Sequence, residues 1–331
     1  MNANTHTPAA AVRPARPEDY PGIARLGDPH AGPEQLSQRA ARLLGYDQHS
    51  AATDPQFHRL VAEAGNALVA TATIRADWAG VVQAGRFWVD AFVDPAWRGR
   101  GLGATLVDHL ERAVPGPVRE LGACLREDHV PAAEHLAEQG FEERFRSWGA
   151  HLDLRAFEPS AYAGLLARLE AAGYRFVPYP ELHAPDKEAR LLALKRHVDR
   201  DIVAFEPIVP AASEDVLDEG YLPDGLIVAL APDGEMVGLA SLRREGPEGP
   251  IGCGLTGVHR DHRGRGLATA LKVRSLEVAK ALGATTIGTG GGGANLAMRR
   301  VNERLGFVVE PLWLTFISER GGRAHEVTHG A

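Results

Sequence analysis

The chain has 331 residues, of which 44% are hydrophobic, and this length and composition predict two globular domains with ordinary cores. The formal net charge of −7 argues against nucleic-acid binding through bulk positive charge. Two cysteines are too few for a disulfide framework, and no stretch has the composition of a signal peptide or a membrane span. We therefore expect a cytoplasmic protein with no nucleic-acid and no membrane partner.

The first half of the chain alternates strand and helix patterns. Residues 1–11, rich in Asn, Thr, Ala and Pro, predict a disordered leader. Apolar alternation predicts strands at 12–15, 66–75, 87–93, 118–125 and 148–154. Helical spacing and helix-start signals predict helices opening at 16, over 33–45, from 102 and over 130–139.

A boundary is expected near residues 156–160, so the predicted domains are 12–157 and 158–318, followed by a mobile tail over 319–331. In the second domain we predict helices over 161–172, 188–198, 267–282 and 296–305. Strands are predicted at 174–179, 226–230, 236–242, 251–258, 285–289 and up to 317. A four-glycine run at 290–293 is expected to form a flexible loop. Each half is thus predicted to be an α+β unit, with helices flanking a mixed, mainly antiparallel sheet.

One motif occurs twice. Residues 93–103 read VDPAWRGRGLG, and residues 258–268, 165 positions further along, read VHRDHRGRGLA. Gly-Phe pairs at 140–141 and 306–307 keep almost the same spacing. A repeat that holds its register over this distance predicts two copies of one domain. Each copy runs from an apolar strand through a glycine-rich turn into a helix, which places unpaired N–H groups at a positive helix end where an anion can bind.

These motifs resemble the coenzyme A diphosphate loop of the GNAT N-acetyltransferase superfamily. Together with Asn295, Met298 and the sequence VNERLGF at 301–307, the second copy is similar to a bacterial subgroup with two GNAT domains in one chain. The resemblance covers residues 12–157 and 160–317. It implies tandem GNAT domains, acetyl-CoA as the cosubstrate, and transfer of an acetyl group to the primary amine of a small molecule by direct attack.

The resemblance assigns cofactor binding to the two motifs and their flanks. In the first half the residues are Phe92, Val93, Arg98, Gly99, Arg100, Gly101, Leu102, Gly103 and Ala104. In the second half they are Gly257, Val258, Arg263, Gly264, Arg265, Gly266, Leu267, Ala268, Thr269 and Asn295. The glycines let backbone amides approach diphosphate oxygens, and the arginines add charge-assisted hydrogen bonds. The strand residues before each loop match the place where a free amide polarises the thioester carbonyl.

Direct attack also requires a group that accepts the proton of the amine. Asp90 is the candidate base in the first half, and its alternative interpretation is a strand-end carboxylate that faces solvent. Leu255 stands at the corresponding position of the second half. The tyrosine that usually serves the family as general acid is replaced by Leu136 and Asn302.

Two other interpretations bear on function. The missing tyrosines favour a catalytically weak, acyl-CoA-binding or regulatory pseudoenzyme as the alternative to an enzyme. A Rossmann-type site is disfavoured because no alternating strand–helix–strand pattern precedes the glycines. No metal site is expected, because no cysteine and no cluster of acids lies at ligand spacing from His259 and His262. The acceptor, the acyl length and the choice between monomer and homodimer stay open.

Overall fold

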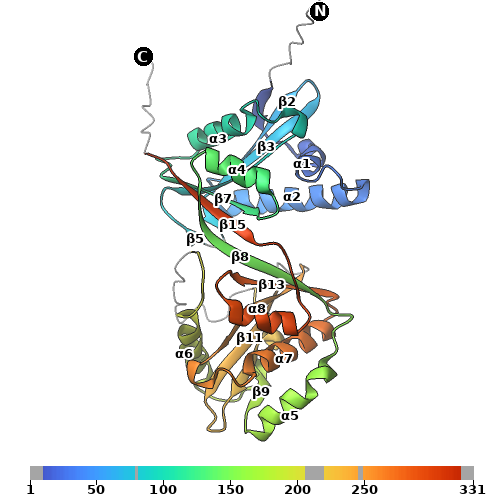
Figure 1. The fold of residues 1–331 in the computed structure, drawn as a ribbon, viewed down its shortest axis with the longest axis vertical. Helices are drawn as coiled ribbons and strands as arrows, with labels where there is room; N and C mark the ends of the chain where they lie inside the picture. The colour runs from blue at the N-terminus through green and yellow to red at the C-terminus, as the bar shows by residue number, and fades with distance from the viewer. Residues whose placement is uncertain (1–9, 79–80, 206–219, 245–248, 322–331) are drawn as a thin grey trace, which may run out of the picture. The chain divides into compact units, whose positions relative to one another are not determined.

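The computed structural model describes residues 10–78, 81–205, 220–244 and 249–321 (Figure 1). The chain divides into two compact units. Unit 1 consists of Met1–Leu125, His129–Arg144 and Thr315–Ala331, and unit 2 of Arg126–Asp128 and Phe145–Leu314. Residues 145–157 thus lie in unit 2 and residues 315–318 in unit 1, whereas linear limits at 157 and 318 were predicted.

Unit 1 carries a mixed sheet in the order β1-β2-β3-β6-β7-β15. Its neighbours from β1 to β6 pair antiparallel, and β6 pairs parallel with β7. The strands are β1 (Ala11–Pro14), β2 (His58–Ala64), β3 (Ala67–Arg75), β6 (Arg86–Val93), β7 (Glu120–Arg126) and β15 (Trp313–Glu319). The helices are α1 (Tyr20–Gly27), α2 (Pro33–Thr53), α3 (Leu102–Ala113) and α4 (Val130–Glu138), and β4 (Asp77–Trp78) pairs with β5 (Val81–Val82) in a separate hairpin.

A buried polar contact fixes α1 and α2 to the sheet of unit 1. Asp47 of α2 is buried, accepts a hydrogen bond from Tyr20 Oη at 2.6 Å and forms an ion pair with Arg59 of β2. Burial, reinforced by the hydrogen bond to Asp47, raises the pKa of Tyr20 well above its usual range. The buried carboxylate therefore has both a charged and a neutral donor, which offsets its desolvation.

Unit 2 repeats this architecture in the order β8-β13-β12-β11-β10-β9. The pairs are antiparallel except β12–β13, which is parallel. The strands are β8 (Glu142–Asp153), β9 (Arg175–Pro178), β10 (Ile227–Leu230), β11 (Met236–Arg244), β12 (Ile251–Val258), β13 (Thr286–Gly292) and β14 (Val308–Val309), which also pairs with β8. The helices are α5 (Ala163–Ala171), α6 (Lys187–Asp199), α7 (Leu267–Ala281) and α8 (Leu296–Arg304).

Two helices of unit 2 cover opposite faces of its sheet. In β10, Ile227 and Ala229 belong to the core cluster that holds α7, whereas Val228 and Leu230 belong to the cluster that holds α6. Successive side chains of a strand point to opposite faces, so α6 and α7 sandwich the strand. This explains why all four residues of β10 are apolar and buried.

The predicted fold class is confirmed, since each unit is a mainly antiparallel mixed sheet flanked by helices. The first strand begins at Ala11, and residues 1–9 and 322–331 lie outside the described residues. None of the helices in the described parts of the chain has both the length and the apolar character needed to cross a membrane.

The glycine run of unit 2 is a strand and not the flexible loop that we expected. Gly290, Gly291 and Gly292 pair with residues 147–149 of β8, and Trp148 Nε1 donates to the carbonyl of Gly292 at 3.1 Å. A Cβ on Gly292 would overlap the carbonyl oxygen of Val203. The expectation was wrong because glycine carries no side-chain periodicity, and here it marks a close backbone approach.

This packing predicts that Gly292→Ala lowers the free energy of unfolding by about 1–3 kcal/mol, because backbone must move to admit the methyl group. Gly164→Ala is the matched control: no heavy atom of the described chain comes within 4 Å of its added Cβ, and it lies in α5. The free energy of unfolding of this control should lie within about 1 kcal/mol of the parent value or above it. Urea unfolding followed by circular dichroism measures both, and equal stabilities would contradict the close approach.

Candidate functional site

Loop 1 (residues 93–103) and loop 2 (residues 258–268) have the same backbone course. Each leaves its strand through one 3-10 turn, at Pro95–Trp97 or Arg260–His262, and enters a helix at a glycine with positive φ. The φ angles are 75° at Gly101, which precedes α3, and 94° at Gly266, which precedes α7. The first amides of both helices have no carbonyl partner within their own helix, so they can donate to an anion.

The arginines of the two loops also make matching hydrogen bonds. Arg98 Nε donates to the carbonyl of Val93 at 3.1 Å, and Arg263 Nε donates to the carbonyl of Val258 at 2.9 Å. Arg100 and Arg265 each donate from Nη2 to the carbonyl four residues earlier, at 3.0 and 3.2 Å. The sequence repeat is therefore a repeat of structure, down to individual donors and acceptors.

A wedge opens beside loop 1 because the parallel strands β6 and β7 diverge. Residues 86–88 of β6 pair with residues 120–122 of β7. Beyond that point β6 continues to Val93, and in the described sheet it pairs there with β3. Asp90 is half-buried and Phe92 is 43% exposed, since the β7 side has opened. An edge of free backbone groups thus leads directly to the amides of loop 1.

Unit 2 has the corresponding opening, with one irregularity. Strand β12 pairs with β13 at Gly252 and Gly288. It then continues to Val258, paired with β11. The register between β11 and β12 shifts next to Ser241, where β12 carries one extra residue. Ser241 Oγ donates to the carbonyl of Leu255 at 3.2 Å and so fixes this bulge. No such shift occurs between β3 and β6.

Asp90, the predicted base, lies in the wedge of unit 1. Its carboxylate forms an ion pair with Arg75 at 3.2 Å, and Arg75 Nη1 donates to Tyr46 Oη at 3.3 Å. Burial raises the pKa of Cys124 on β7, and the charge of Asp90 adds to that rise, so the two groups lie close together. Cys124 is thereby kept as an unreactive thiol. The link to Tyr46 is a tertiary contact that sequence spacing could not reveal.

The two positions where the family usually has tyrosine hold no acid here. Asn302 is fully buried, and neither atom of its carboxamide has a partner among the described residues. Asn295 is the N-cap of α8, where its side chain accepts from the amide of Met298 at 3.2 Å. Its first-half counterpart, His129, makes no side-chain cap bond at the start of α4.

Loop 2 is surrounded by side chains of its own unit. Asp201 forms ion pairs with Arg260 and with Arg263, the second at 2.5 Å. Hydrogen bonds from these two arginines hold the pKa of Asp201 well below its usual range. Arg265 Nη1 donates to Tyr174 Oη at 2.7 Å, and that hydroxyl also lies 2.9 Å from a ring nitrogen of His262.

Two histidine rings near loop 2 stack on each other. The rings of His197 and His259 lie 3.8 Å apart between centroids. Burial lowers the pKa of His197, and the nearby His259 and Arg260 lower it further. Throughout the described part of the chain, no group of three or more His, Cys, Asp or Glu side chains is placed to hold a metal ion.

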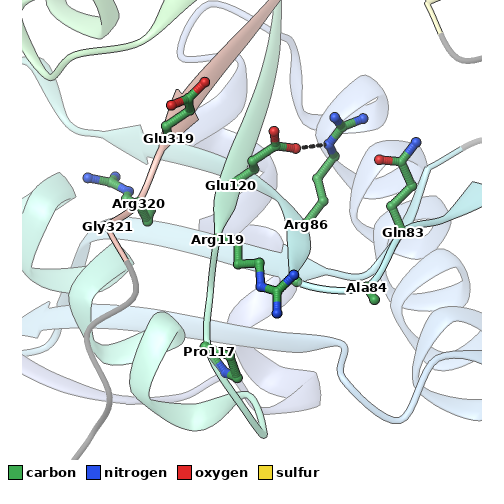
Figure 2. A pocket seen from close by; sticks show the side chains of 10 residues that line it. Gln83, Ala84, Arg86, Pro117, Arg119, Glu120, Glu319, Arg320 and Gly321 are labelled. Carbon is green, nitrogen blue, oxygen red and sulfur yellow. Dashed lines mark hydrogen bonds and ion pairs between the residues drawn. The ribbon is translucent and has the colours of Figure 1, made fainter.

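A hollow of about 740 Å³ lies elsewhere in unit 1. Figure 2 shows Arg86 paired with Glu120 at its wall and Arg119 and Arg320 beside it. Arg86 begins β6, whereas loop 1 follows Val93 at the other end of this strand, about 23 Å away for seven residues of extended chain. The hollow therefore lies at the end of β6 that pairs with β7, away from loop 1.

Comparisons with known proteins identify the family of the chain. A family model described as the acetyltransferase (GNAT) family matches residues 24–141 and 196–307, one region in each half. No protein of curated function matches the chain.

Three solved structures share the fold over nearly the whole chain. A GCN5-related N-acetyltransferase from Sphaerobacter thermophilus is 21% identical, with 94% of this chain and 95% of that one covered and a TM-score of 0.64. A tandem GNAT protein from the clavulanic acid biosynthesis pathway is 21% identical, with 94% and 98% covered and a TM-score of 0.58. A glucosamine N-acetyltransferase region of a fungal multi-domain β-N-acetylglucosaminidase is 15% identical, with 94% and 38% covered and a TM-score of 0.65.

Burial, with the nearby His259 and Arg260 as smaller causes, predicts that the pKa of His197 lies below its ordinary value of 6.5, and that His259→Gln raises this pKa by removing a neighbouring positive charge. Because the unfolded chain binds this proton at higher pH than the folded one, stability falls as the pH drops through the ordinary imidazole range. NMR titration of the ring protons measures the shift. His135→Gln, an exposed change in unit 1, is the control. A pKa of His197 at or above 6.5 in the parent would contradict this burial, and an unchanged pKa in His259→Gln would contradict the influence of His259.

Proposed function

Because this chain belongs to the acetyltransferase (GNAT) family, we propose that it transfers an acetyl group from acetyl-CoA to the primary amine of a small molecule. Members of the family use acetyl-CoA as their cosubstrate. One observation carries the proposal: the wedge between β6 and β7 opens beside the unpaired amides of loop 1. A diphosphate and a thioester on one extended molecule would match these two features.

Coenzyme A would be held by its diphosphate at the loops. The glycines of each loop bring amides to the phosphate oxygens without a Cβ in the way, and the two arginines of each Arg-Gly-Arg segment supply charge. The proposed contacts are Val93, Arg98, Gly99, Arg100, Gly101, Leu102, Gly103 and Ala104 in unit 1, and Val258, Arg263, Gly264, Arg265, Gly266, Leu267, Ala268 and Thr269 in unit 2. Asn295 would use its Nδ2, because its oxygen caps α8.

The pantetheine arm would lie along the free edge of β6. An extended chain that carries amide groups can pair with such an edge as an added strand does. The same edge, around Phe92 and Val93, would then direct an N–H group at the thioester carbonyl. Gly257 and Val258 hold the equivalent places in β12.

The chemistry follows as a single displacement. The lone pair of the amine attacks the carbonyl carbon, the oxyanion is stabilised by strand amides, and the carbon–sulfur bond breaks to release the thiolate. The amine proton passes to Asp90, directly or through a water molecule. The ion pair with Arg75 at 3.2 Å keeps the Asp90 carboxylate in a fixed orientation in the wedge.

A second function has support from one observation. Leu136 and Asn302 cannot protonate a leaving thiolate, and they occupy the two positions where the family usually has tyrosine. This favours a protein that binds acyl-CoA and catalyses weakly or not at all. The two functions differ in turnover and not in affinity for the cofactor.

An assay of thiol release from acetyl-CoA across a panel of primary amines separates these functions. We expect release that depends on the amine, with an acetylated product detected by mass spectrometry. Binding of acetyl-CoA with no acetylated amine in the panel would favour the binding protein. Absence of acetyl-CoA binding would contradict both functions.

Asp90→Asn should lower kcat by about 10²–10⁴-fold, because the amide cannot accept the proton, and leave the KM for acetyl-CoA near the parent value. The control is Asp108→Asn, which removes an exposed carboxylate of α3 that pairs with Arg112. An unchanged rate would assign Asp90 a structural role only.

A further inference from the structure

We propose that the two loops bind coenzyme A unequally: loop 1 takes the diphosphate, whereas Asp201 occupies the arginines of loop 2 and keeps that site weak. The proposal rests on the proposed function, because it assumes that the ligand of these loops is coenzyme A. It concerns which loop is available and which residue decides it. Three differences between matched positions, each 165 residues apart, carry the argument.

The first difference is the counter-charge. Arg98 and Arg263 make the same bond to their strands, yet the Nη2 of Arg263 lies 2.5 Å from the carboxylate of Asp201. The second arginine in this ion pair is Arg260, and its position in loop 1 is occupied by Pro95. A carboxylate thus already neutralises two of the three arginines of loop 2.

Asp201 is held in this position by its own backbone. Its amide donates to the carbonyl of Val198 at 3.0 Å, in the turn that follows α6. Val198 is buried and packs against Gly257 of β12, the strand that leads into loop 2. The carboxylate is therefore delivered to the arginines by a packed element and not by a long mobile side chain.

The second difference is the cover over the helix N-terminus. A Cβ added to Gly101 would meet no heavy atom of the described chain within 4 Å, whereas one added to Gly266 would lie 2.8 Å from Leu165 Cδ1. Leu165 belongs to α5, which packs beside α7. The buried Tyr174 also binds Arg265. Loop 2 is thus covered at Gly266 by its own unit, whereas the described residues place nothing over Gly101 of loop 1.

The third difference lies in the strand. Phe92 is 43% exposed in the wedge of unit 1. Its counterpart is Gly257, and a Cβ there would overlap the Val198 side chain. In unit 2 the space that matches the exposed face of β6 is therefore filled by α6.

These contacts give an unequal affinity. A diphosphate that enters loop 2 must separate Arg263 from Asp201 and then lie beside that carboxylate, so like charges face each other. At the protein surface, charges a few ångströms apart interact strongly enough to change an affinity about tenfold. Removing the charge of Asp201 should therefore strengthen the second site by about tenfold or more, and added salt should reduce that gain.

The test is calorimetric titration of the full chain with acetyl-CoA. We expect one tight site per chain in the parent, and a second site about tenfold tighter than before in Asp201→Asn. The matched control is Asp153→Asn, which removes the same charge from an exposed Asp–Arg pair with Arg155 elsewhere in unit 2. It should titrate like the parent.

A second pair of variants does not depend on how Asp201→Asn folds. Arg98→Glu should abolish the tight site of the parent, and Arg263→Glu should leave it intact. Two equal sites in the parent, or a tight site lost in Arg263→Glu and kept in Arg98→Glu, would overturn the inference while the proposed function stands. Absence of binding in the parent and in every variant would overturn the proposed function itself.

Discussion

The structure depends on one constraint, the left-handed backbone at the glycine that precedes each loop helix. Gly101 and Gly266 both have positive φ, a conformation that other residues adopt at a cost of about 1–2 kcal/mol. That turn directs the first helical amides away from the helix and toward the end of the preceding strand. The matching arginine bonds to Val93 and Val258 then close each loop against its strand. A single backbone geometry thus produces a strand-to-helix connection and a set of unpaired helix amides together.

Most of the fold follows from the sequence, because it rests on local patterns. The repeat at 93 and 258, the helical spacing after each loop and the alternation in the strands predict elements that the structure contains. The glycine run at 290–293 escaped this reasoning, since its geometry is set by Trp148 and Val203, which are distant in sequence. Strand β8 likewise begins at Glu142, six residues before the predicted start, in a stretch of charged residues that lacks clear alternation.

The site is predictable to the same extent and for the same reason. The glycines and arginines of both loops could be named because their spacing carries the mechanism. Asp201 and Leu165 could not be named, because each reaches loop 2 from an element that has no motif. Asp201 lies 62 positions before Arg263, and no periodicity relates the two. Sequence reasoning therefore identifies the candidate residues of a loop, whereas tertiary packing determines which other side chains surround them.

This distinction changes how a repeated motif is interpreted. The glycines of loop 2 are required by its φ angles whether or not a ligand binds, since the turn also connects β12 to the buried helix α7. Their presence is therefore equally consistent with a binding site and with a structural turn. The discriminating observations are the ones around the loop: a carboxylate on its arginines, a leucine over its glycine and a valine against its strand. Loop 1 has the same backbone, and the described chain places no such side chains there, so two copies of one motif lie in different surroundings within one chain.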